Sequence, residues 1–276
     1  MNIGVIATIC IVIVLYIHIN FQLHTSNDLE IYEIAMPTKT KLEEVCNFKQ
    51  PVLFDYYEET ISKCTLDSLH EYNAFDVMVF DDTYVGIPLP LEKGRELFKT
   101  GNHATFHNET FLQETMMRRY YDLTDLTLRP PMVTSMTLDL FFGSLNYTTR
   151  LQYHTSCRNY FLVTQGTITI KLTPPRNTPF MKETKKYDTQ DFFSDLDPWT
   201  DDPKKVKFLE LVVPVGKLLY IPAYWWYSIR LEKDACVCIF HYKTLTNLIA
   251  TLPDIGMGIL QRHNTTMKVL PVIHLD

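Results

Sequence analysis

Positive charge is missing from the start of the chain, where no lysine or arginine precedes Lys39. Residues 3–17 carry no charge of either sign, and Ile19 and Phe21 extend the apolar run. Such a run is near the lower limit of about 17 residues for a membrane-spanning helix. A cleaved signal peptide needs a basic start and a small-residue cleavage site, and residues 18–26 offer no such site. The sequence therefore favours a retained single-pass anchor over residues 1–24, entering the membrane through residues 3–21. A buried core helix is the third alternative.

The rarity of basic residues also bears on partners and on membrane orientation. The net charge is −6, which argues against the dense Lys/Arg surface that nucleic acid binding requires. The positive-inside rule needs lysine or arginine close to the helix ends, so it leaves open which side of the membrane the domain faces. Should the domain be lumenal, three sites match the N-glycosylation pattern. They are Asn108, Asn146 and Asn264.

Cysteine is sparse, with six residues in 276, and no zinc-ligand spacing or internal repeat is present. Cys10 lies in the predicted anchor and the others are scattered, so no disulfide framework is indicated. We expect free thiols, although Cys46 and Cys64 could pair in an oxidising compartment. Apolar residues make up 46% and charged residues 21%, which is typical of a globular chain long enough for one sizeable domain.

Beyond the anchor, the chain divides into a connection and a folded domain. Residues 25–40 are polar, contain Pro37 and lack a long apolar run, so they predict a tether. The folded domain is predicted over residues 41–276. Its first part shows patterns for three helices and two strands. The helices are expected at 41–45, 90–98 and 108–121, and the strands at 50–54 and 77–80.

From Met132 onward, short apolar runs alternate with turn residues, a pattern typical of antiparallel barrels and jelly rolls. We therefore expect a mainly β domain folded as a double-stranded β-helix, with flanking helices. Residues 177–203 are a polar insert between strands, and residues 245–262 a C-terminal helical segment broken at Pro253. The seven expected strands are 136–142, 159–164, 167–172, 208–213, 218–221, 225–231 and 235–242.

One late strand carries a resemblance to a known family. The sequence Pro214-Val215-Gly216-Lys217-Leu218 leads into Leu219-Tyr220-Ile221-Pro222-Ala223-Tyr224-Trp225-Trp226-Tyr227. It resembles JmjC-type, cupin-like dioxygenases, which read roughly pG-x-x-L-y-i-P-x-x-W-W-H and use the last histidine to bind metal. Tyr227 stands at that position here. The resemblance covers roughly residues 46–242 and implies a cupin-like barrel; the simpler alternative is any buried aromatic strand.

A second motif of the family is nearly intact in its frame. The family pattern resembles F-x-G-(x)5-T-x-x-H-x-D-(x)3-N-(x)6-G-x-K-(x)5-P-P. Anchoring on Gly143 and Thr149 puts Gln152 and His154 at its His and Asp positions. Anchoring instead on Asn159 and Gly166 puts Tyr153 and Thr155 there, and a third alignment runs from His154 to Ser156. The anchors differ by one inserted residue.

None of these alignments supplies a carboxylate, because residues 151–160 contain no Asp or Glu. A non-haem Fe(II) oxygenase needs two histidines and one carboxylate. Ile168 replaces the lysine that in many relatives binds the far carboxylate of 2-oxoglutarate. His154 alone survives as a candidate metal ligand, although a hydrogen-bonded pocket residue is the simpler interpretation, and no catalytic residue is assigned. The degenerate pocket positions are Thr149, Gln152, Tyr153, His154, Thr155, Ser156, Asn159, Ile168 and Tyr227.

Three functional hypotheses follow from the resemblance. The first is a non-catalytic binding or scaffold module without cofactors, which keeps the groove of a protein hydroxylase for a protein or peptide partner. The second is an Fe(II)/2-oxoglutarate-dependent hydroxylase with an atypical metal set, in which Asp139 or the loop 191–197 adds a carboxylate to His154 and Tyr227. The third is a structural membrane component. The helical segment at 245–262 could also form a homodimer contact.

Overall fold

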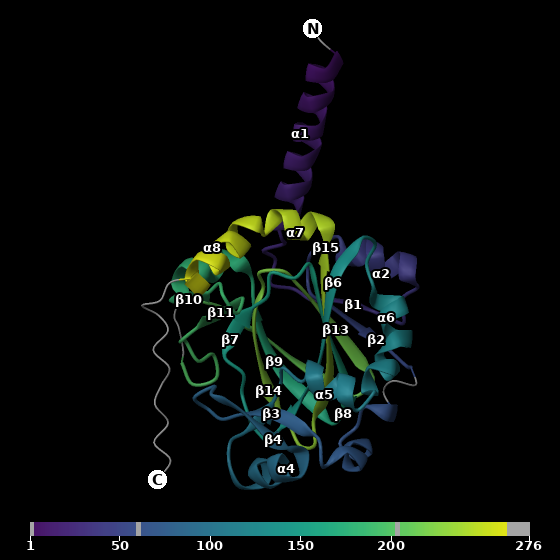
Figure 1. Ribbon diagram of the computed structural model, residues 1–276, viewed down its shortest axis with the longest axis vertical. Helices are drawn as coiled ribbons and strands as arrows, with labels where there is room; N and C mark the ends of the chain where they lie inside the picture. The colour runs from purple at the N-terminus through teal and green to yellow at the C-terminus, as the bar shows by residue number, and fades with distance from the viewer. Residues whose placement is uncertain (1–2, 59–61, 202–204, 264–276) are drawn as a thin grey trace.

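The computed structural model describes residues 3–58, 62–201 and 205–263, which form an N-terminal helix and two facing β-sheets. Helix α1, Ile3–Leu23, projects from one end of the folded part (Figure 1) and none of its side chains is buried. By length and composition alone, α1 is long and apolar enough to cross a membrane. The mainly β architecture predicted from the sequence is therefore confirmed at the level of two large, mostly antiparallel sheets.

The larger sheet has nine strands and includes the parallel pair β1–β2 at one edge. Its strands follow one another in the order β1 Tyr32–Ile34, β2 Val52–Asp55, β13 Lys217–Pro222, β8 Arg158–Gln165, β15 Cys236–Thr244, β6 Val133–Gly143, β5 Ala104–Thr105, β3 Asp76–Phe80 and β4 Gly86–Pro90.

The smaller sheet has six strands, all paired antiparallel. Its strands are, in order, β10 Glu183–Lys186, β11 Asp191–Ser194, β7 Leu151–Tyr153, β14 Trp226–Leu231, β9 Thr167–Thr173 and β12 Leu209–Pro214.

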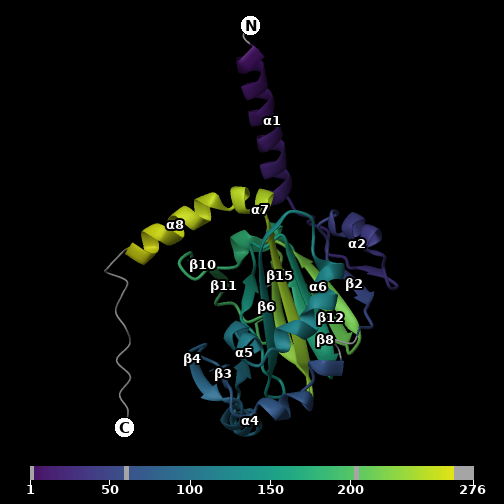
Figure 2. The same cartoon turned by 45° about the vertical axis from the view of Figure 1, so that its right-hand side comes forward.

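Helices lie on the outer face of the nine-stranded sheet and at its ends (Figures 1 and 2). The α-helices are α2 Lys39–Cys46, α4 Leu91–Thr100, α5 Glu109–Glu114, α6 Asp122–Leu128, α7 Leu245–Ala250 and α8 Leu252–His263. The described residues also contain the short 3₁₀ segments η1 Ser68–Tyr72, η2 Met117–Tyr121 and η3 Pro175–Phe180.

Three apolar clusters hold these layers together. One packs helices α2, α5 and α6 on the outer face of the nine-stranded sheet, through side chains such as Leu42, Phe111 and Leu128. The second contains side chains from the inner faces of both sheets, such as Phe161 of β8 and Ile170 of β9. The third, which includes Trp226, lies on the outer face of the six-stranded sheet. Because one cluster lies between the sheets, side chains of both sheets converge there on a common interior.

Two glycines form corners where the chain passes from one sheet to the other. Gly166 joins β8 to β9 with a φ of +66°, and a Cβ there would lie 2.7 Å from the Lys233 carbonyl oxygen. Gly216 joins β12 to β13 with a φ of +80°. Left-handed backbone and a close backbone approach both favour glycine. The turn at residues 165–166 therefore crosses between the two sheets.

All seven strands predicted after Met132 are confirmed, with shifts of one to three residues at their ends. The predicted helix at 108–121 is instead two segments, α5 and η2, because Met116 between them adopts a φ of 56°. The break expected at Pro253 is confirmed, since α8 starts at Leu252. Each of the six cysteines lies within the described residues and is a free thiol.

Two segments predicted to be irregular carry strands. The predicted tether, residues 25–40, contains β1 and the first residues of α2, and its Thr25 is buried and accepts a hydrogen bond from Trp225 Nε1. The predicted insert at 177–203 contains the β10–β11 hairpin, and β11 pairs with β7. Residues 25–40 are thus packed against the domain and not a free tether, and the insert carries strands of its own, because sheet pairing with distant strands overrides the polar local composition.

Two of the three glycosylation candidates can be assessed. Asn108 is buried, and its amide donates to Thr105 Oγ1 and the Leu140 carbonyl while accepting from the Met78 backbone N–H. An asparagine engaged in this way is closed to a glycan. Asn146 is exposed, and Asn264 lies outside the described residues.

Candidate functional site

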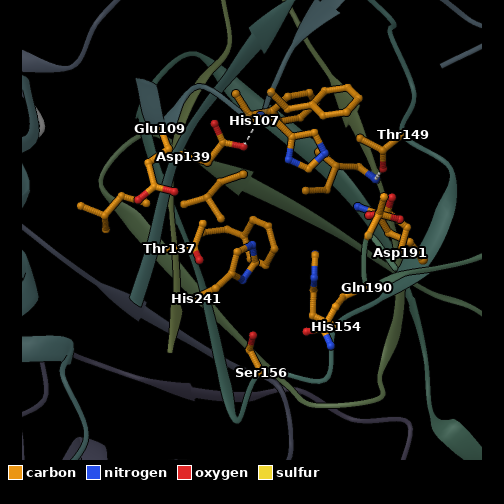
Figure 3. Close-up of a pocket in the computed structure, with 18 of the residues that line it drawn as sticks. His107, Glu109, Thr137, Asp139, Thr149, His154, Ser156, Gln190, Asp191 and His241 are labelled. Carbon is orange, nitrogen blue, oxygen red and sulfur yellow. Dashed lines mark hydrogen bonds between the residues drawn. The ribbon is translucent and has the colours of Figure 1, made fainter. Parts of the chain in front are cut away.

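A cavity of about 580 Å³ lies between the two sheets (Figure 3). The nine-stranded sheet contributes side chains of β6, β8 and β15, including Phe161 and His241, and the six-stranded sheet contributes Gln152 of β7 and Tyr227 of β14. The β10–β11 turn and the start of α5 complete the lining with residues such as Gln190 and Glu109. This volume is within the range of small-molecule sites.

Gln152 and Tyr227 face each other across the pairing of β7 with β14. Gln152 Nε2 donates to the Tyr227 hydroxyl at 3.3 Å. His154 lies two residues beyond Gln152, and its ring centre is 5.8 Å from that of Tyr227. All three side chains line the cavity, so the geometry brings together the three positions given by the alignment on Gly143 and Thr149.

The positions offered by the second alignment do not converge. Tyr153 points to the outer face of the six-stranded sheet, where it stacks on Phe192 at 5.1 Å and its hydroxyl contacts Glu183. Thr155 is buried, and its carbonyl accepts a hydrogen bond from Asn247. Neither residue lines the cavity. Strand alternation explains this, because Tyr153 lies between Gln152 and His154 and must face the other way.

The remaining predicted positions have mixed roles. Thr149 lines the cavity, and its hydroxyl accepts from the Ile229 backbone N–H at 2.9 Å. Ser156 also lines the cavity. Ile168 is completely buried in the apolar cluster between the sheets and does not line the cavity. Asn159 is buried behind the cavity and holds one of its histidines in place.

That histidine is His241, whose Nδ1 lies 2.7 Å from Asn159 Oδ1. Asn159 Nδ2 donates to the carbonyls of Ser156 and Ile221, so Oδ1 is the amide's acceptor and His241 Nδ1 carries the proton. The neutral ring therefore keeps Nε2 as an acceptor. The ring of His154 lies 4.3 Å from that of His241, tilted by 39°.

Both imidazoles are neutral at pH 7. Burial, with His107 and Lys243 as smaller causes, lowers the pKa of His154 to about 4. Burial and the neighbouring His154 lower the pKa of His241 well below its usual value. Two neutral rings side by side avoid the repulsion that two imidazolium ions would create in this interior.

This histidine pair predicts a specific pH dependence of stability. His154 stays neutral in the folded protein down to about pH 4, whereas in the unfolded chain it takes up a proton below about 6.5. The unfolded state then binds more protons, so stability is fully present above pH 6.5 and falls as the pH drops from 6.5 towards 4. When the free energy of unfolding is measured with denaturant at pH 7 and at pH 5, its fall between the two should be smaller for His154→Gln than for the unmodified protein. Replacement of the exposed His70 by Gln should leave the fall unchanged, and an equal fall in all three proteins would contradict the assignment.

Asp139, proposed from the sequence as an alternative metal carboxylate, is engaged by the backbone. Its Oδ2 accepts from the His107 N–H at 2.7 Å, and its Oδ1 accepts from the N–H groups of Asn108 and Leu140 at 2.8 and 2.7 Å. Burial raises its pKa, while His107 and these three donors oppose that rise. Asp139 thus fixes the segment that leads into α5, and both of its oxygens are engaged by backbone donors.

The donor set does not fit Fe(II). The three converging positions offer an amide, an imidazole and a phenol whose pKa burial raises above its usual value. Iron of this class takes two imidazoles and a carboxylate. Within residues 3–58, 62–201 and 205–263, no group of three or more His, Cys, Asp or Glu side chains is placed to hold a metal ion.

The resemblance places Ile168 where many relatives have the lysine that binds 2-oxoglutarate, and this side chain is apolar and buried. Lys171, the next lysine along β9, faces the other side of the sheet, where its Nζ lies 3.5 Å from Glu210 Oε2.

Several lining residues were not identified from the sequence. Lys243 lies two positions beyond His241 on the same face of β15, and its Nζ donates to Gln190 Oε1 at 2.5 Å. Burial lowers the pKa of Lys243. The alternation of β15 was the signal that could have found it. His107 and Gln190 come from loops that carry no such signal. Asp191, from the segment 191–197 considered above as a source of a carboxylate, is the first residue of β11 and does line the cavity.

A search of curated proteins finds no match to this chain. Residues 89–246, more than half of the sequence, match the family described as a cupin-like domain. That stretch contains β6 to β15 and every degenerate position named above. The chain therefore belongs to the cupin-like domain family, as its resemblance to JmjC-type proteins predicted.

Proposed function

We propose that this protein is a membrane-anchored cupin-like domain that binds a ligand in its inter-sheet cavity without iron or 2-oxoglutarate chemistry. The observation that carries the proposal is the hydrogen bond between Gln152 and Tyr227. It joins two of the positions at which an iron oxygenase would hold metal. An amide and a phenol satisfy each other there, which favours a pocket that binds over one that oxidises.

The chain path supports a double-stranded β-helix as the fold of this binding module. From β7 to β9 and again from β12 to β15, successive strands alternate between the two sheets. The alternation is that of jelly rolls, in which two sheets enclose one interior. A cavity at one end of that interior is where a ligand of this fold would lie.

The lining supports a ligand with both apolar and hydrogen-bonding parts. Phe106, Phe161 and Ile239 offer apolar surface, whereas His154 and Thr137 offer polar atoms. A few placed polar groups on an apolar wall are what orient a ligand in such a site. We take the ligand to be a small organic molecule or a side chain of a partner protein.

The direct test is a metal and turnover assay on the full chain in detergent. Purified with added Fe(II) or Mn(II), the protein should retain far less than one metal ion per chain, and with 2-oxoglutarate it should release no succinate. The reason is the lack of two ligands of the facial set. Stoichiometric metal together with succinate release that His154→Ala abolishes would instead establish an oxygenase with an atypical site.

The anchor half of the proposal rests on α1, a helix of 21 residues without Asp, Glu, Lys or Arg, none of whose side chains is buried. A helix of this length and apolar character satisfies its own backbone hydrogen bonds and can cross the hydrocarbon core of a bilayer. The chain should resist alkaline carbonate extraction and keep Met1 or Asn2 as its mature N-terminus. A mature protein beginning near Ser26 would identify residues 1–25 as a cleaved signal.

A further inference from the structure

Helix α8 turns its apolar side away from the protein. Leu252, Met257, Ile259 and Leu260 are exposed, and Leu260 reaches 67% exposure. At 100° per residue these side chains lie on one half of the helix, together with Pro253 and Gly256. A surface helix of a globular domain normally presents the opposite arrangement, with its apolar stripe against the core.

The polar side of α8 is fastened to the β10–β11 turn. Gln261 Oε1 accepts from the Tyr187 backbone N–H at 2.8 Å, and Arg262 Nη2 donates to the Asp188 carbonyl at 2.7 Å. Gly258 lies so close that a Cβ there would be 2.5 Å from the Tyr187 carbonyl oxygen. The helix is therefore fixed in rotation, and it cannot roll to bury its apolar side against the domain.

The same end of the molecule carries the base of α1. Helix α7 contacts α1, and Gln22 Nε2 donates to Thr246 Oγ1 at 3.0 Å. Lys49 Nζ donates to the carbonyls of Phe21 and His24, which ties the end of α1 to the domain from another side. Figures 1 and 2 show α7 at the foot of α1, with α8 running away from it across the top of the domain.

We propose that α8 lies in the interface of the membrane that α1 crosses, with its apolar side in the boundary between headgroups and acyl chains; this rests on the anchoring proposed above. A helix at the foot of a span and transverse to it runs along the membrane surface. Amphipathic helices bind there with their apolar face about 5–10 Å into the headgroup and acyl boundary. The exposed face of α8 is the face directed away from β10 and β11, so it is the face that meets lipid.

A second contact lies on another side of α1. Phe48 is exposed and lines the same shallow pocket as Phe21, His24 and Lys49. An exposed phenylalanine beside a lysine matches the apolar and basic residues of segments that lie in a membrane interface. Phe48 and α8 would then contact the surface on different sides of the anchor and fix the tilt of the domain.

The test compares two isoleucines with the same exposure. Ile259 on α8 and Ile87 on β4, at the end of the domain far from α1, are each 53% exposed. Each is replaced by cysteine in a Cys10→Ser background and labelled with a nitroxide, with the background protein measured to correct for other thiols. The full chain is placed in nanodiscs of four parts phosphatidylcholine to one part phosphatidylserine. At position 259, collisions with oxygen should exceed those with a water-soluble nickel chelate, and at position 87 the order should reverse.

Each outcome separates this proposal from the anchor itself. If the chain enters nanodiscs but position 259 is as open to nickel as position 87, α8 does not touch lipid and the proposal is overturned while the anchor stands. If the chain does not enter nanodiscs, both fail. Low nickel access at position 259 could also be accompanied by spin–spin broadening that disappears when the protein is diluted with unlabelled chain. That result would mean that a second copy covers the apolar side of α8, and it would also overturn the proposal. Adding Leu260→Asp should raise nickel access at position 259 with an unchanged circular dichroism spectrum.

Discussion

Restoring the three metal-ligand positions together is expected to raise the Fe(II) affinity of the protein roughly 100-fold or more, since even outer-shell losses at metal sites cost about 10–100-fold. The change is Gln152→His, His154→Asp and Tyr227→His. Gln152 and Tyr227 are paired across β7 and β14, and His154 lines the same cavity, so the three new side chains would converge. Metal content after dialysis, with Mn(II) as an air-stable substitute, is the measurement.

The control keeps both new histidines but leaves His154 in place. Without the carboxylate the facial set is incomplete, and the gain in affinity should be far smaller. Circular dichroism distinguishes a failure to bind from a failure to fold, because Tyr227 is buried and its replacement leaves space. A folded triple variant with no gain over the control would mean that these positions do not correspond to the metal set of the family.

The largest expected effect on stability is at the ion pair of Glu43 with Arg158. Arg158 is buried, and its Nη1 and Nη2 donate to the two carboxylate oxygens of Glu43 at 2.7 and 2.5 Å. Glu43→Ala leaves a guanidinium buried without its partner, which costs about 3–5 kcal/mol in comparable sites. Because Glu43 is partly exposed, we expect the lower end, about 3 kcal/mol, in guanidinium chloride unfolding of the protein in detergent.

The neighbouring residue provides a matched control. Glu44 lies on the same helix α2 and forms an ion pair with Lys41 at 3.1 Å, but both side chains of this pair are exposed. Glu44→Ala makes the same change in helix propensity, and the loss of an exposed pair costs at most about 1 kcal/mol. Equal losses of unfolding free energy for Glu43→Ala and Glu44→Ala would contradict this account, because they would mean that Arg158 finds another partner when Glu43 is removed.

The sequence predicted most of the fold where burial leaves a local pattern. Strands such as β8 and β15 are runs of buried residues, and the apolar pattern alone found them. Strand β7 has only three residues, and its alternation of buried Leu151 and Tyr153 around Gln152 is too short to read. In the β10–β11 hairpin, β10 is polar and partly exposed, and the apolar run of β11 is only Phe192 and Phe193, so composition indicated a polar insert.

The site shows the same limit at the level of single residues. The absence of a carboxylate between residues 151 and 160 was visible in the sequence, but the two anchors of the motif differed by one residue. Only the pairing of Gln152 with Tyr227, residues 75 apart in the chain, favours one alignment over the other. Asp139 was a candidate ligand by residue type alone, and its three backbone donors could not be foreseen because they come from a loop and from its own strand.

The β10–β11 turn joins two surfaces of the molecule. Tyr187 and Asp188 hold α8, and the next three residues, 189–191, line the cavity. If both lipid and ligand prefer one conformation of this turn, each must strengthen the binding of the other by the same factor, because coupling free energies are reciprocal. Ligand affinity measured in detergent would then differ from that in a bilayer, and the ratio of the two would report the coupling through four or five residues of backbone.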